Sequence, residues 1–135
     1  MAIVKGFAGE LVQQVSVDEA YLEVTDKVDA AYGATHDAIL EAALPLARAI
    51  KDAIVRERQL TATIGIAPNK LLAKIASSNF KPNGLTLVRD SEKAAFMRPL
   101  PVGAIHGVGK VTEGALQRAG FNTVADIQDT ERDLR

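Results

Sequence analysis

The sequence predicts an α/β (α+β) fold, in which helices cover one face of a β-sheet and a separate helical segment follows. As far as Pro99, β-branched and apolar runs typical of strands alternate with residues at helical spacing. Beyond Pro99 only helical patterns remain, and glycines interrupt them. A chain of 135 residues is long enough for one ordinary core with a small appendage. The other face of the sheet would be open to a substrate.

The first strand is predicted over residues 15–25, after a weakly patterned stretch in which Gly6 and Gly9 should break any regular element. Its two faces differ in polarity: Ala20, Leu22 and Val24 alternate with Glu19, Tyr21 and Glu23. The alternation of a strand would place Asp18 on the apolar face, where burying an unpaired carboxylate costs free energy. Either the backbone bends near Val17–Asp18 or Asp18 meets a cation, and both outcomes suit a metal site at the end of a strand. A hairpin turn at Asp18 with a solvated Glu19 fits the pattern equally well.

A helix is predicted from apolar residues at helical spacing between Ile39 and Ile54. Pro45 lies either in the first turn of a helix over about residues 44–58 or at a kink in a longer helix. A second strand is predicted over residues 60–67, and Gly65 in its middle indicates that another backbone or a ligand passes close.

Asn69 is the predicted N-cap of the next helix. The turn-forming residues 81–84 then lead into a third strand over residues 85–88. A short helix is predicted over residues 91–98, because Pro99 cannot continue it.

Beyond Pro99 the pattern predicts a helix, a glycine hairpin and a second helix. Gly107 and Gly109 let backbone N–H groups converge at a helix N-terminus, which suits phosphate oxygens, and Lys110 adds positive charge. Two residues should mark helix ends, namely Gly120 as a C-terminal glycine and Thr123 as an N-cap.

Charge is divided unevenly along the chain. Residues 1–60 hold six Lys/Arg and ten Asp/Glu, whereas residues 61–135 hold ten and seven. An acidic site facing a basic surface suits cation-assisted handling of a polyphosphate, although a solvated helix face explains Lys70 and Lys74 equally well.

The composition narrows the classes of protein. The absence of cysteine excludes disulfides and thiolate metal sites, and His36 and His106 form no metal-ligand pattern. No apolar run approaches the ~20 residues of a membrane span, and residues 1–9 do not form a signal peptide. We therefore expect a soluble, cytoplasmic protein.

Three motifs occur in order: Ser16–Thr25, Ile64–Ser77 followed by Lys81–Gly84, and Leu100–Lys110. Together they resemble the Y-family translesion DNA polymerases, and most closely the DinB type, which is DNA polymerase IV-like. The resemblance runs from about Val12 to Ile127. It implies a DNA-directed DNA polymerase that adds deoxynucleotides to a primer 3′ end during translesion DNA synthesis.

The resemblance also implies site residues. Asp18 and Glu19 match the family's catalytic, metal-binding carboxylates, which hold two Mg²⁺ ions with Mn²⁺ as a possible substitute. Lys81 matches a lysine near the incoming triphosphate. The hairpin residues that should bind the DNA backbone are Gly107, Gly109 and Lys110. Primer–template DNA, deoxynucleoside triphosphates and, in the complete protein, a sliding clamp are the implied partners.

Other motif residues are expected to be structural: Ser16 in shaping the turn, Tyr21 in packing, and Lys70 and Lys74 on the helix. The resemblance divides the chain into a partial palm over residues 1–98 and a partial thumb over residues 99–135. The family's first metal-binding motif has no match in residues 1–11, and the fingers and little finger are missing too. We therefore expect a palm-and-thumb fragment with very weak or no polymerisation on its own.

Two other functions remain open. One is a non-catalytic module that binds the DNA backbone and keeps a palm-like fold, but two carboxylates near DNA phosphates would be repelled. The other is a palm-fold nucleotide cyclase or a related phosphotransferase, but such an enzyme would not need a DNA-binding hairpin.

Overall fold

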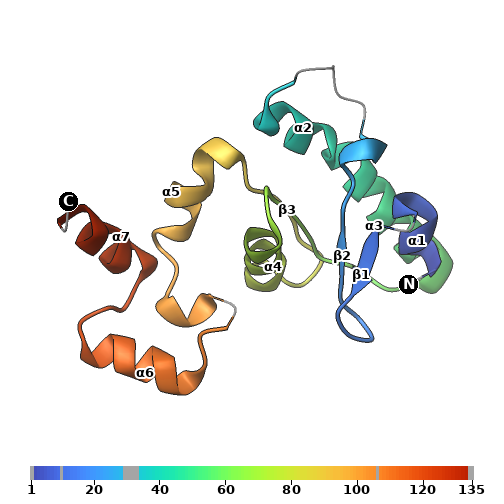
Figure 1. The fold of residues 1–135 in the computed structure, drawn as a ribbon. Helices are drawn as coiled ribbons and strands as arrows, with labels where there is room; N and C mark the ends of the chain where they lie inside the picture. Colours follow the sequence, from blue (N-terminus) through green and yellow to red (C-terminus); the bar gives the residue numbers. More distant parts are fainter. Residues whose placement is uncertain (1, 10, 29–33, 106, 134–135) are drawn as a thin grey trace. The chain divides into compact units, whose positions relative to one another are not determined.

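The computed structural model describes residues 2–9, 11–28, 34–105 and 107–133 (Figure 1). The chain divides into two compact units, Met1–Asp90 and Ser91–Arg135. Both helices and strands are present, which confirms the predicted mixed α/β class. The division lies eight residues before the domain boundary expected at residues 98 and 99, and the palm and thumb assignments stay predictions.

The first unit begins with helix α1 (Ala2–Ala8), so the expectation of no regular element in residues 1–11 was wrong. Ala8 is fully buried, and α1 packs against α3 and β1. No atom comes within 4 Å of a Cβ built at Gly6. Tertiary packing therefore outweighs the low helix propensity of glycine.

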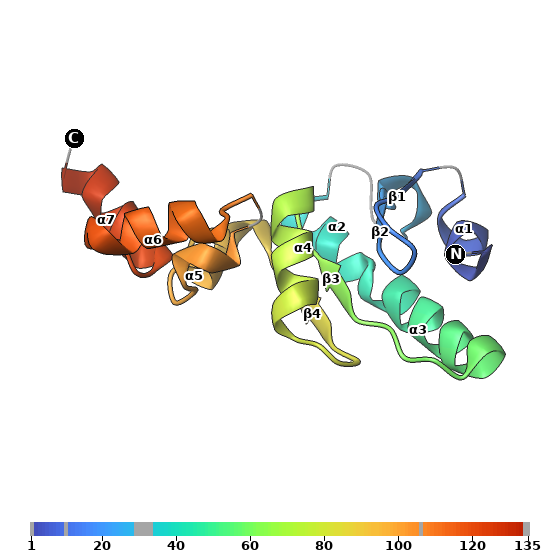
Figure 2. The same ribbon diagram turned by 90° about the horizontal axis from the view of Figure 1, so that it is seen from below.

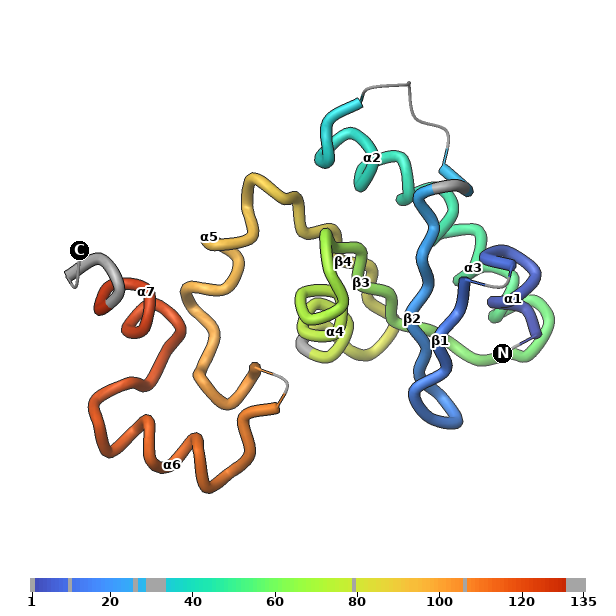
Figure 3. Tube along the Cα trace, in the orientation of Figure 1, coloured from blue at the N-terminus to red at the C-terminus, as the bar shows by residue number. Residues whose placement is uncertain are grey.

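Strands β1 (Val12–Gln14) and β2 (Ala20–Leu22) form an antiparallel hairpin with Val12 opposite Leu22. Figure 3 follows the chain along β1, around the turn and back along β2. The single strand predicted over residues 15–25 is therefore wrong in extent, since its first residues form the hairpin turn.

Helices α2 (His36–Ala42) and α3 (Leu44–Arg58) follow, and Pro45 lies in the first turn of α3. The first of the two alternatives for this proline is confirmed. Proline suits that position because a first-turn N–H has no partner within the helix. Three α3 residues are buried at helical spacing, namely Ala47, Ile50 and Ala53.

Strands β3 (Ile64–Ile66) and β4 (Leu85–Leu87) pair in parallel, with helix α4 (Lys70–Asn79) between them in sequence. Figure 2 shows α4 lying alongside β3 and β4, and α4 packs against both strands. The N-cap prediction is confirmed, because the Asn69 side chain accepts a 2.9 Å bond from the Leu72 N–H. In the described residues the strands form two two-stranded sheets instead of one layer.

The second unit contains α5 (Lys93–Met97), α6 (Lys110–Arg118) and α7 (Val124–Asp133). Short 3-10 helices cover Thr25–Lys27 in the first unit, Asp90–Glu92 at the point in the sequence where the units divide, and Val102–Ala104 in the second unit. An isolated bridge joins Pro101 to Thr123, and the nearby Val102 and Val124 are buried. Gly120 follows α6 with a φ of +93°, which confirms its predicted role at the helix end.

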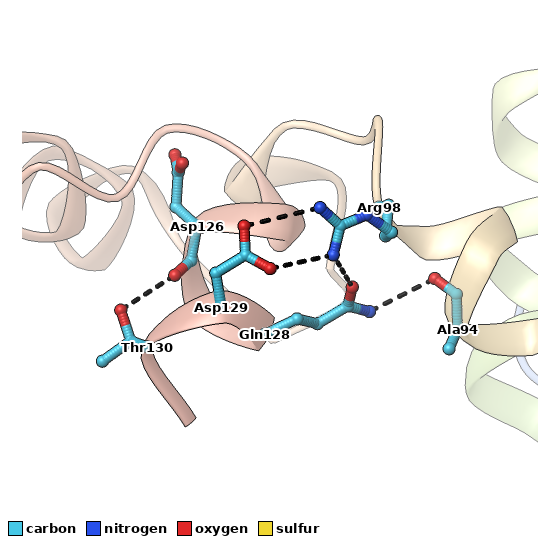
Figure 4. Close-up of polar contacts among 6 residues, drawn as sticks. All are labelled: Ala94, Arg98, Asp126, Gln128, Asp129 and Thr130. Carbon is cyan, nitrogen blue, oxygen red and sulfur yellow. Dashed lines mark hydrogen bonds and ion pairs between the residues drawn. The ribbon is translucent and has the colours of Figure 1, made fainter. Parts of the chain in front are cut away.

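Polar contacts close this unit across α5 and α7 (Figure 4). Arg98 donates to Gln128 and Asp129 at 3.1 Å each, and Gln128 donates to the Ala94 carbonyl at 3.2 Å. The hydrogen bonds to Asp129 raise the pKa of Arg98 above its ordinary value. Because the Arg98 and Asp129 side chains are 40% and 52% exposed, their ion pair orients the helices more than it stabilises them.

Candidate functional site

The acidic motif lies at the bend between β1 and β2. The Val15 and Ser16 N–H groups donate to the Glu19 carbonyl at 2.9 and 3.3 Å and close the hairpin. The Ser16 hydroxyl donates to Asp18 Oδ1 at 3.0 Å, in agreement with the expected turn-shaping role. Of the two alternatives for Asp18, the backbone bends, and the bend leaves this carboxylate exposed to solvent.

Glu19 is not the freely solvated residue of the hairpin-turn alternative. Its Oε1 lies 2.6 Å from Lys74 Nζ, and the two side chains are only 35% and 23% exposed. The ammonium group of α4 thus offsets one of the two adjacent negative charges. Sequence reasoning missed this contact, although the spacing of Lys70 and Lys74 places both on one face of the helix.

Lys70 makes the second contact between α4 and the hairpin. Its ammonium donates to the Gln13 side chain and lies 5.7 Å from the centroid of the Tyr21 ring. Such a cation–π contact adds a modest attraction at an exposed site. Lys70 and Tyr21 therefore have the structural roles expected from the sequence, and α4 holds the acidic hairpin at two points.

The Lys81 turn follows the C-terminal end of α4. Lys81 is exposed, and in the described part of the chain no hydrogen bond or ion pair joins it to Asp18 or Glu19. Asn83 has a φ of +55°, and a Cβ on Gly84 would lie 2.2 Å from the Phe80 carbonyl oxygen. The turn therefore needs a residue that tolerates a positive φ, followed by a glycine.

The glycine hairpin precedes α6 in the second unit. Gly107 has a φ of +96°. Gly109 is the N-cap residue of α6, and because glycine has no side chain it leaves the first N–H groups of the helix uncapped. Space is open around both glycines, and Lys110 is exposed in the first turn of the helix. The first N–H groups of a helix have no partner within it, so the hairpin can present them to an anion. His106 lies outside the described residues.

The described residues include no cluster of three or more histidine or carboxylate groups able to share a metal ion. The adjacent carboxylates of Asp18 and Glu19 nevertheless fit Mg²⁺, which takes hard oxygen ligands. Mg²⁺ is commonly bound by one or two carboxylates together with the phosphates of a substrate. This donor set therefore suits a cation that arrives with a nucleotide.

The acidic hairpin on an α/β unit and the helix–hairpin–helix segment in the same chain are the two features through which the sequence resembles the Y-family DNA polymerases. The sequence model of the impB/mucB/samB family matches residues 1–78, and that of the IMS family HHH motif matches residues 90–121. The chain therefore belongs to the impB/mucB/samB family, and its relatives are of the DinB type.

Two similar proteins are DNA polymerase IV enzymes. That of Exiguobacterium sibiricum is 47% identical over 120 residues, which are 89% of this chain and 31% of the relative. That of Methanoculleus marisnigri is 46% identical over 127 residues, 94% of this chain and 32% of the relative. The chain thus spans about a third of the length of the curated relatives it matches.

Solved structures agree with this family. DinB from Sulfolobus solfataricus is 36% identical with a TM-score of 0.78, over 96% of this chain and 35% of that one. An insertion ternary complex of Dbh DNA polymerase is 36% identical with a TM-score of 0.79, over 93% of this chain and 34% of that one. As a separate finding, none of the helices in the described ranges has both the length and the apolar character needed to cross a membrane.

Proposed function

We propose that this chain supplies part of the palm and thumb of a template-directed, error-prone translesion DNA polymerase. The observation that carries the proposal is the Asp18–Glu19 pair, placed at a hairpin bend and held there by Ser16 and Lys74. A protein that only bound DNA would gain nothing from adjacent carboxylates near phosphates, because like charges repel. The similarity to DNA polymerase IV enzymes supports the same function.

In this function Asp18 and Glu19 would hold the two Mg²⁺ ions through their carboxylate oxygens. When bound, two Mg²⁺ ions stabilise the attacking and leaving oxygens of an in-line nucleotidyl transfer. Lys81 places a point charge beside the triphosphate and offsets the charge that develops on pyrophosphate. The positive charge of Lys74 balances the negative charge of Glu19 while no metal ion is bound. A sliding clamp remains a predicted partner of the complete protein.

The direct test uses a chimera in which this chain replaces the matching third of the Exiguobacterium sibiricum DNA polymerase IV. We expect Mg²⁺-dependent primer extension by the chimera, because the replaced segment keeps both carboxylates and the glycine hairpin. The 135-residue chain alone should extend primers very weakly or not at all. A folded chimera without any extension activity, or robust extension by the chain alone, would contradict this proposal.

Replacing Lys110 by alanine should weaken DNA binding equally for all sequences, because a phosphate contact carries no base information. The slope of log K against log salt should become shallower by about 0.9, the value for one phosphate contact on duplex DNA. Fluorescence anisotropy at several salt concentrations measures both quantities. Arg118→Ala, at the other end of α6, is the control and should keep the wild-type slope. An unchanged slope for Lys110→Ala would exclude this phosphate contact.

A further inference from the structure

The turn that carries Lys81 is held by a lysine from another helix. Lys51 of α3 donates from Nζ to Asn83 Oδ1 at 2.7 Å, to the Gly84 carbonyl at 3.2 Å and to the Ala62 carbonyl. A lysine ammonium has three N–H donors, so these three oxygens can use all of them. Lys51 thereby joins α3, the segment before β3 and the turn before β4.

The acceptors explain why this lysine matters to the shape of the turn. Gly84 is also tied to β3, since its carbonyl accepts from the Ile64 N–H at 3.0 Å and its N–H reaches Thr63 Oγ1 at 3.4 Å. Among the described interactions, only the bond from Lys51 ties the Asn83 side chain to the rest of the unit. Lys51 therefore fixes the one residue of the turn that has a positive φ.

The surroundings of Lys51 differ from those of a solvated surface lysine. The side chain is half-buried, and none of its three acceptors is a carboxylate. Burial lowers the pKa of Lys51, an effect that nearby Asp52 partly opposes. The desolvation cost of this partly buried charge offsets much of the gain from its hydrogen bonds, so these contacts fix the geometry of the turn more than they raise net stability.

We propose that Lys51 is a positioning residue, which fixes the 81–84 turn so that Lys81 is presented to the triphosphate of the incoming nucleotide. Lys51 donates to two residues of the turn, Asn83 and Gly84, whereas Lys81, two residues before Asn83, is exposed. This inference rests on the proposed function, because it takes the triphosphate to be the ligand of Lys81.

Calorimetric titration of the 135-residue chain with dATP and Mg²⁺ tests the link to Lys81. Lys51→Met should weaken binding about 10-fold, whereas Arg48→Met, elsewhere on α3, should leave it unchanged. In a Lys81→Ala background, Lys51→Met should have no further effect, because it acts through the lysine already removed. Independent, additive losses would show that Lys51 does not act through Lys81 and would overturn the inference.

Amide hydrogen exchange tests, without any ligand, whether Lys51 stabilises the conformation of the 81–84 turn. Lys51→Met should speed exchange of the Gly84 amide about 10-fold in both Lys81 backgrounds, while Arg48→Met should not. Asn83→Gly is the second variant: it keeps a positive φ accessible, removes one acceptor and should also speed exchange. Unchanged exchange in both variants would overturn the positioning role. Equal dATP affinity of the wild type and Lys81→Ala would instead overturn the proposed nucleotide contact, and with it the ligand named here.

Discussion

Replacing Asp18 by asparagine is expected to abolish Mn²⁺ binding by this chain and to slow primer extension by the chimera at least about 100-fold. Metal ions contribute several kcal/mol of transition-state stabilisation, and each 1.36 kcal/mol corresponds to about tenfold in rate. Asparagine can still accept the hydrogen bond from the Ser16 hydroxyl, so the bend should persist. Asp18 is also the carboxylate of the pair that Lys74 does not compensate. Its negative charge is therefore the one that a cation would use first.

The matched control for this variant is Glu23→Gln on the same hairpin. Glu23 is exposed and accepts from the Thr25 N–H at 3.0 Å and from the Thr25 hydroxyl, which together lower the pKa of its carboxyl group. Glutamine keeps an acceptor for Thr25, so metal binding and extension should stay at the wild-type level. Titration with Mn²⁺ followed by calorimetry measures the first quantity. If Asp18→Asn bound Mn²⁺ as well as the wild type, the DNA-binding module would become the better description.

Replacing Gly65 by alanine is expected to destabilise the first unit by about 3 kcal/mol, the upper end of the usual cost of overpacking. A Cβ at this position would lie 2.4 Å from the Ala73 carbonyl oxygen and 2.9 Å from both Ala76 Cβ and the Ser77 nitrogen. Two of these three atoms belong to the backbone of α4, so a rotamer change cannot relieve the contact. Denaturant unfolding followed by circular dichroism would show the loss as a lower midpoint.

Gly6→Ala is the control for the same chemical change. Gly6 lies inside α1, and no atom comes within 4 Å of the added Cβ. Alanine should be neutral or stabilise the helix by roughly 0.5–1 kcal/mol, because glycine is the poorer helix former. Equal midpoints for the two variants would mean that α4 does not approach β3 as closely as the structure indicates.

Local sequence rules predicted the elements whose causes are local. Pro45 in a first helical turn, Asn69 as an N-cap and Gly120 after a helix were all confirmed, because each depends on a few neighbouring backbone groups. The same rules failed for residues 1–11 and for the extent of the first strand. There, the packing of α1 on α3 and the pairing of β1 with β2 decide the outcome, and neither contact can be read from the residues of a single element.

The sequence by itself determined the family, the mixed fold and the acidic and glycine-rich motifs, because these depend on residue types in a fixed order. The tertiary structure alone decided which charges meet: Lys74 with Glu19, and Lys51 with the turn beside Lys81. The physical reason is distance along the chain. Side chains 55 and 32 residues apart come within hydrogen-bond reach only after helices α3 and α4 have packed on their strands.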